Sequence, residues 1–216
     1  MSGAAEGLKQ QTVFVVDDDP SIRDGVANLL ESVGIAAQSY SSAEEFKQHW
    51  RRESGGCLLL DARLPGISGV EFQEQMRSAG IALPIVFMTA HGDIPMVRKV
   101  MKAGAVEFLV KPFQKEELLH AVKEAFALDR RIREEEQGRH SIRARIESLS
   151  PREREVMGMV TAGWLNKQIA AELHISEVMV KTHRRNMMDK MQADSLAALV
   201  KFCERAQEPA RKARNR

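Results

Sequence analysis

Polar side chains directly follow four short apolar runs in the first 125 residues of this chain. In chain order they are Asp17, Asp18 and Asp19, then Asp61, then Thr89, then Lys111. One polar residue after an apolar run is explained by capping. Four sets in equivalent places indicate one shared site.

These residue types suit the handling of a phosphoryl group with the help of a metal ion. Clustered carboxylates are oxygen ligands of the kind that Mg²⁺ prefers, and a dication relieves their mutual repulsion. A lysine and a hydroxyl can bind phosphoryl oxygens, and a carboxylate can accept the group as an aspartyl-phosphate. The sequence contains neither the P-loop pattern nor G-x-G-x-x-G. The phosphoryl donor is therefore expected to be another molecule.

The apolar runs and the stretches between them predict an α/β fold. Runs at 13–16, 57–60, 84–88 and 108–110 are short and continuous, as in strands buried on both faces, and a weaker run covers 35–40. Helical stretches lie at about 21–32, 43–51, 69–78, 95–103 and 115–128. Five β-α units predict a doubly wound, five-stranded parallel sheet of flavodoxin-like type, whose ligand site lies at the carboxyl ends of the strands.

Residues at the ends of the predicted helices agree with this assignment. Gly34, Gly80 and Gly104 follow three helices at the place where a left-handed backbone is wanted. Ser42 and Ser68 are predicted N-caps. Asp19 precedes Pro20, and proline is favoured at the first helical position. Asp19 is therefore predicted to cap the first helix, unlike its two acidic neighbours.

Length and charge distribution indicate two parts. The chain has 216 residues, and residues 1–129 hold 13 lysines and arginines against 18 acids, whereas residues 147–216 hold 13 against 9. The acidic part suits a cation, and the basic part suits a polyanion such as nucleic acid. No apolar run is long enough to span a membrane, and the first residues do not form a secretory signal. A cytoplasmic protein with reduced thiols at Cys57 and Cys203 is expected.

The four motifs "VVDDD", "LLLDARLPGISG", "VFMTAHGD" and "EFLVKPF" resemble the receiver domain of two-component response regulators, over residues 11–128. The resemblance implies that Asp61 accepts a phosphoryl group from a sensor histidine kinase. It implies that Asp17, Asp18, Asp61 and the backbone carbonyl of Arg63 bind Mg²⁺.

The same resemblance implies a switch in the neighbouring strands. Thr89 would bond the phosphoryl group, Lys111 would contact it, and Phe108 would turn inward with Thr89. Plain core packing is the alternative for Phe108, since an apolar strand needs it in any case. The family also implies a cis bond before Pro112 and a flanking role for His91.

The second half of the chain contains only helical stretches. Residues 129–146 are mostly charged and could extend the fifth helix or form a solvated linker. Helices are predicted at about 151–162, 166–173, 177–191 and 195–205, the first opened by a capping box of Ser150 and Glu153 with Pro151 between them. The pattern predicts an all-α, four-helix domain over 147–210.

Residues 166–191 read as a helix-turn-helix with a turn at 174–176. The second helix carries Val180, His183, Met187 and Met191 at the spacing of a buried stripe. Its other side is basic, which suits insertion into the major groove of DNA. A solvated basic face on an ordinary bundle helix is the alternative.

The segments "LSPREREVM", "NKQIAAEL", "VKTHRRNMMDKM" and "SLAALV" resemble the LuxR-type helix-turn-helix DNA-binding domain. With the receiver, the chain resembles a response regulator of the NarL/FixJ family. The resemblance implies base contacts by Lys181, Thr182 and Arg185. The remaining residues expected to contact DNA are Asn166, Lys167 and Arg184.

Three residues depart from the family's pattern. His174 stands in the turn where the family usually has glycine, so a positive φ there would be strained. Met179 stands where the family usually has threonine, which puts one phosphate contact in doubt. Trp164 is bulkier than usual and either packs on the receiver or a partner, or is a partly exposed packing residue.

The expected function is a phosphorylation-switched transcription factor that dimerises and binds double-stranded DNA, with RNA polymerase as a further candidate partner. One alternative is a DNA-binding protein whose receiver is not phosphorylated in use. Another is a Mg²⁺-dependent phosphatase, an enzyme that usually needs an acid two residues after its nucleophile. Ala62 and Arg63 follow Asp61 instead, so slow self-dephosphorylation is the only turnover expected.

Overall fold

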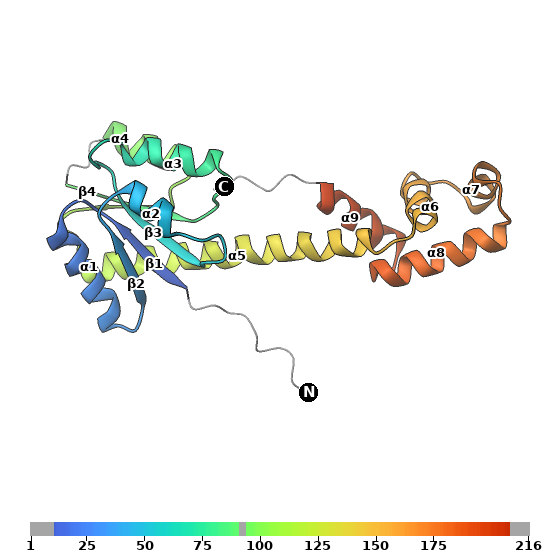
Figure 1. Cartoon of the computed structure of the whole chain (residues 1–216), viewed down its shortest axis with the longest axis horizontal. Helices are drawn as coiled ribbons and strands as arrows, with labels where there is room; N and C mark the ends of the chain where they lie inside the picture. The colour runs from blue at the N-terminus through green and yellow to red at the C-terminus, as the bar shows by residue number, and fades with distance from the viewer. Residues whose placement is uncertain (1–10, 91–93, 208–216) are drawn as a thin grey trace. The chain divides into compact units, whose positions relative to one another are not determined.

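The computed structural model of the chain describes residues 11–90 and 94–207 (Figure 1). The chain divides into two compact units, the first ending at Arg133 and the second beginning at Glu134. Across the residues that the structure describes, no helix is long and apolar enough to cross a membrane.

The first unit is built on a parallel sheet, as the sequence predicts. Its described strands are β1 (Thr12–Val16), β2 (Ala36–Tyr40), β3 (Gly56–Asp61), β4 (Ile85–Thr89) and β5 (Glu107–Val110). They lie in the order β2-β1-β3-β4-β5, and every pair is parallel. Because all strands run the same way, Asp61, Thr89 and the residues after β1 and β5 meet at one edge of the sheet.

Helices cover both faces of this sheet (Figure 1). They are α1 (Pro20–Ser32), α2 (Ala43–His49), α3 (Gly69–Ser78), α4 (Ile94–Lys102) and α5 (Lys115–Glu147). Alternate residues of β1 enter different cores, since successive strand side chains point to opposite faces. Val13 and Val15 pack with α1 and α5, whereas Phe14 and Val16 pack with α2, α3 and α4.

The predicted helix caps are confirmed in the first unit. The side chains of Asp19, Ser42 and Ser68 accept hydrogen bonds from the backbone N–H groups of Ser21, Glu45 and Glu71. Gly34, Gly80 and Gly104 all have positive φ. Helix α2 ends at His49, two residues before the predicted end, because Trp50 adopts an extended backbone and packs against the core.

The charged stretch after residue 128 is helical, so α5 continues without a break to Glu147. Its arginines, glutamates and alanines are good helix formers. The helix ends before Ser150, whose ψ of 160° is extended, as required of a residue that precedes a proline. Residues of the stretch 129–146 belong to both units.

Asp129 anchors α5 to the opposite end of the sheet from the acidic site. It is buried, and its Oδ2 accepts hydrogen bonds from Gly56 N (2.9 Å) and from the side-chain amide of Gln11 (3.1 Å). Arg133 pairs with the same carboxylate and donates to the carbonyl of Ser54 at 2.6 Å. The buried charge is thus paired and fully bonded, which makes its burial tolerable.

The second unit is helical. Beyond the last turns of α5 it contains α6 (Pro151–Thr161), α7 (Asn166–Leu173), α8 (Glu177–Met191) and α9 (Leu196–Gln207). Its core holds Val156, Ile169, Val180, Met187 and Leu199, together with Ile142 of α5. The predicted capping box of Ser150 and Glu153 opens α6.

Candidate functional site

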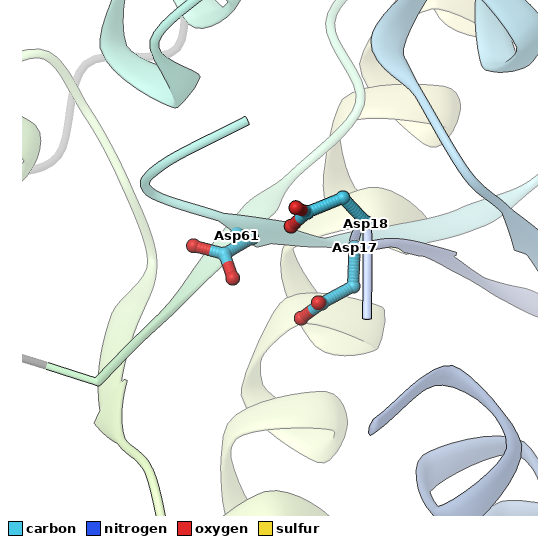
Figure 2. Close-up of side chains that lie close together, drawn as sticks. All are labelled: Asp17, Asp18 and Asp61. Atoms are coloured by element: carbon cyan, nitrogen blue, oxygen red, sulfur yellow. The ribbon is translucent and has the colours of Figure 1, made fainter. Parts of the chain in front are cut away.

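Three carboxylates gather at the carboxyl end of the sheet (Figure 2). Asp17 and Asp18 follow β1, and Asp61 ends β3, the neighbouring strand. One oxygen from each lies within 4.8 Å of the others. Asp17 is fully buried, Asp61 is 8% exposed and Asp18 is exposed. Three hard oxygen donors this close together fit a small divalent cation such as Mg²⁺.

Lys111 joins two of these carboxylates. Its ammonium donates to Asp17 Oδ2 and to Asp61 Oδ2, each at 2.5 Å. Burial raises the pKa of Asp17, and the hydrogen bonds from Lys111 and from the amide of Asp19 act in the opposite direction. Burial acts to lower the pKa of Lys111, but the two carboxylates outweigh it and the pKa is raised. The lysine is thus held charged between the predicted acceptor and a predicted metal ligand.

Backbone groups hold the site residues in place. The N–H of Arg63 donates to Asp61 Oδ1 at 2.8 Å, which orients the predicted acceptor. Gly69 opens α3 directly against the end of β3, where a Cβ would lie 2.6 Å from the carbonyl oxygen of Asp61. The hydrogen bond to Asp61 places the backbone of Arg63 at the site. Metal binding by the carbonyl of Arg63 stays a prediction.

The predicted switch residues lie on the next two strands. Thr89 ends β4 with 1% exposure, and its carbonyl accepts a hydrogen bond of 2.7 Å from Lys111 N. Phe108 is half-buried, pairs in register with Phe87, and packs against the core on the α2–α4 side of the sheet. The bond between Lys111 and Pro112 is cis, as the family resemblance implies. His91 lies outside the described residues.

Arg23 was not predicted at this site. Its guanidinium donates to the carbonyl oxygen of Asp17 at 2.6 Å, from the first turns of α1. Arg23 lies four residues after the cap Asp19, which is about one helical turn. Its side chain is therefore on the same side of α1 as the cap and can reach the end of β1. That spacing was the available signal, since the cap had already placed the start of α1.

A second candidate site lies on the helix-turn-helix formed by α7 and α8. Ser176 caps α8 by accepting from Met179 N, and His174 has the left-handed φ of 54°. Val180, Met187 and Met191 are fully buried, as the stripe predicts, while His183 is only half-buried. Lys181, Thr182 and Arg185 are exposed on the other side of α8, and Lys167 is exposed on α7.

Two of the residues predicted to contact DNA bind each other. Arg184 Nη1 donates to Asn166 Oδ1 at 2.9 Å, and both residues are half-buried. This bond links α7 to α8. Lys190 of α8 is likewise bonded to Glu153 of α6 at 2.7 Å, so polar contacts fix α8 against both neighbours.

The fold and the two sites define a class of protein, a signal receiver joined to a helix-turn-helix unit. Residues 13–123 match the family model of the response regulator receiver domain, and residues 147–203 match that of bacterial regulatory proteins of the luxR family. The chain therefore belongs to the response regulators that combine a receiver domain with a LuxR-type DNA-binding domain.

Its relatives are FixJ-like. Nodulation protein W of Bradyrhizobium diazoefficiens is 45% identical over 94% of this chain and 89% of its own length. The transcriptional regulatory protein FixJ of the same organism is 40% identical over 90% of this chain and 95% of its own length. Among solved structures, the response regulator StyR is 47% identical with a TM-score of 0.79, over 90% of this chain and 98% of that one. These relatives span nearly the whole chain, so both domains are shared.

Proposed function

We propose that this protein is a transcription factor switched by phosphorylation of Asp61. The hydrogen bonds from Lys111 to Asp61 and Asp17 carry the proposal. They bring together the predicted acceptor Asp61, the predicted metal ligand Asp17 and the positive charge of Lys111. Burial of Thr89 at the adjacent strand end supports a hydroxyl beside them.

In the phosphoryl transfer, an oxygen of Asp61 forms a bond to phosphorus as the bond between phosphorus and the histidine nitrogen of a sensor kinase breaks. Lys111 stabilises the negative charge on the transferred group. Mg²⁺ held by Asp17, Asp18, Asp61 and the carbonyl of Arg63 would neutralise the phosphoryl oxygens. Slow self-dephosphorylation is the only turnover proposed.

The switch then runs through the strands next to Asp61. Thr89 and Lys111 move to the new oxygens, and Phe108 turns inward. The phosphoryl group must interact more favourably with one receiver conformation than with the other, since otherwise no equilibrium shifts. The conformation it favours is proposed to pair two chains through the surface of α4, β5 and α5.

The paired chains bind double-stranded DNA in the cytoplasm and act on RNA polymerase. Two helix-turn-helix units of a dimer read half-sites about 34 Å apart, one turn of the double helix. We propose residues 11–128 as the receiver, 129–146 as the helical linker and 147–210 as the DNA-binding domain, with 208–210 outside the described residues. Base contacts are assigned to Lys181, Thr182 and Arg185, and supporting contacts to Asn166, Lys167 and Arg184.

Intact-mass spectrometry tests the proposal. Acetyl phosphate with Mg²⁺ should add one phosphoryl group to the wild-type protein and raise its affinity for promoter DNA. Asp61→Asn should prevent both changes, whereas Asp24→Asn, at an exposed position of α1, should leave both intact. A wild-type protein that stays unmodified contradicts the switch. Equal DNA affinity for wild type and Asp61→Asn after phosphorylation favours a receiver that does not regulate binding.

A further inference from the structure

The exposed face of α8 begins with an apolar residue. Val180, Met187 and Met191 define the buried side of the helix, each fully buried. The opposite side carries Val178, Thr182, Arg185 and Asp189, which recur at i, i+4, i+7 and i+11 and are all exposed. Val178 is 71% exposed, the highest value among the large hydrophobic residues of the described chain.

Solvent alone gives no reason for a valine here. A β-branched side chain lowers helix propensity slightly, and Val178 gains no core packing in return. Single exposed apolar residues are common on protein surfaces. This one lies in the first turn of the helix that belongs to the DNA-binding domain, and the N-terminal residues of such a helix contact base edges.

The neighbours of Val178 indicate what covers it. Lys181 and Arg185 are both exposed within two helical turns of Val178. The ion pair between Arg185 and Asp189 is long, at 4.0 Å, and highly exposed, so it holds the Arg185 side chain weakly. These cations complement DNA. The hydroxyl of Thr182 donates to the carbonyl oxygen of Val178 at 3.0 Å, so its proton is engaged within the helix. Val178 and the methyl group of Thr182, one helical turn apart, thus offer an apolar strip beside the two cations.

The apolar feature of the major groove is the 5-methyl group of thymine. We infer that Val178 is a specificity-determining residue, which contacts a thymine methyl group in each half-site of the bound DNA. The inference rests on the proposed function, since it names what α8 reads once it lies in the groove. Met179 is 46% exposed but lies a quarter turn to the side of this face, and it is not assigned the contact.

Deoxyuridine tests the contact directly, because it pairs like thymidine and lacks only the methyl group. The full-length protein, treated with acetyl phosphate and Mg²⁺, first selects its site from a random double-stranded DNA library. Each thymine of the selected site is then replaced by deoxyuridine. At one thymine per half-site, the replacement should weaken wild-type binding about three- to fivefold, as expected for one buried methyl group.

Val178→Ala removes the contact in both half-sites. It should therefore bind the thymine site about as weakly as the wild type binds the site with deoxyuridine in both half-sites, and it should not distinguish the two. Leu196→Ala is the matched control, since Leu196 is another exposed apolar residue of the same unit, at 43% on α9. It should keep the full preference for thymine. Unfolding monitored by Trp164 fluorescence, in a Trp50→Phe background, verifies that each variant is folded.

The outcomes separate the inference from the proposed function. A wild-type protein indifferent to deoxyuridine at every thymine overturns the inference and leaves sequence-specific binding intact. A Val178→Ala variant that retains the full preference also overturns it. If no library sequence is enriched by the phosphorylated protein, the proposed function fails, and the inference fails with it.

Discussion

Asp129 accepts a hydrogen bond of 2.9 Å from the backbone N–H of Gly56, which lies 73 residues earlier in the chain. Gly56 begins β3, the strand that ends in Asp61. The same carboxylate pairs with Arg133 and bonds Gln11. One buried charge thus fixes α5 to the sheet strand that carries the proposed phosphorylation site.

We expect Asp129→Ala to lower the free energy of unfolding of the first unit by about 2 to 4 kcal/mol, because Gly56 N–H and Arg133 lose a buried partner. Urea unfolding followed by Trp50 fluorescence, in a Trp164→Phe background, measures the change. Glu124→Ala, at an exposed position of α5, is the control and should change little. A loss below about 1 kcal/mol would show that the anchor contributes little.

Mg²⁺ should stabilise the first unit, because a ligand that binds only the folded state raises its stability by mass action. The gain should be about 2.7 kcal/mol at one hundred times the dissociation constant. Thermal unfolding with and without MgCl₂ measures it. Asp17→Asn should remove most of the gain, whereas Asp24→Asn should not. Equal melting temperatures at saturating MgCl₂ in the wild type contradict the metal site.

The gain from Mg²⁺ should also depend on pH. Burial raises the pKa of Asp17 above its ordinary 3.8. Without metal, the contribution of Asp17 to the free energy of unfolding is therefore fully present below pH 3.8 and is lost as pH rises through the folded-state pKa. Protons compete with the metal between pH 3.8 and the folded-state pKa, so the gain should be smaller just above pH 3.8 than near pH 8. A gain that is independent of pH contradicts this assignment of charge.

Gly69→Ala should destabilise the first unit by about 1 to 3 kcal/mol and slow the phosphorylation of Asp61. The new Cβ would lie 2.6 Å from the carbonyl oxygen of Asp61 and 2.9 Å from the ring of Phe87, so α3 must move away from the site. Gly25→Ala in α1 is the matched control, because a Cβ there meets no atom within 4 Å. That control should stabilise the helix slightly, since alanine is the better helix former. Equal phosphorylation rates for the two variants would count against the steric argument.

The second unit should lose stability in acid through Glu153. The hydrogen bond from Lys190 lowers the pKa of Glu153 below its ordinary 4.5. The pair's contribution is therefore present above 4.5 and is lost as pH falls through the folded-state pKa. Glu153→Gln should reduce the loss of unfolding free energy at acid pH, whereas Glu155→Gln, at an exposed position, should leave that loss unchanged. Unfolding followed by Trp164 fluorescence in a Trp50→Phe background measures both, and an unchanged loss in Glu153→Gln contradicts the assignment.

Much of the fold could be predicted because its signals are local. Apolar runs of strand length, glycines with positive φ and capping residues such as Ser68 and Ser150 depend on neighbours within a few residues. The acidic site could be predicted as well, since parallel strands bring their carboxyl ends to one edge. The sequence did not decide whether α5 continues through residues 129–146, because a mostly charged stretch lacks the periodic apolar residues that indicate a helix.

Chain order and helical period already show which residues stand at the strand ends and which helix carries the basic face. The partners of these residues follow only from packing in three dimensions. Lys111 reaches Asp17 across 94 residues, Asp129 reaches Gly56 across 73, and Arg184 bonds Asn166 instead of facing outward alone. Such contacts depend on how elements pack in space, which residue types and spacing leave open. The exposure of Val178 is of the same kind, since only packing shows which side of α8 is covered.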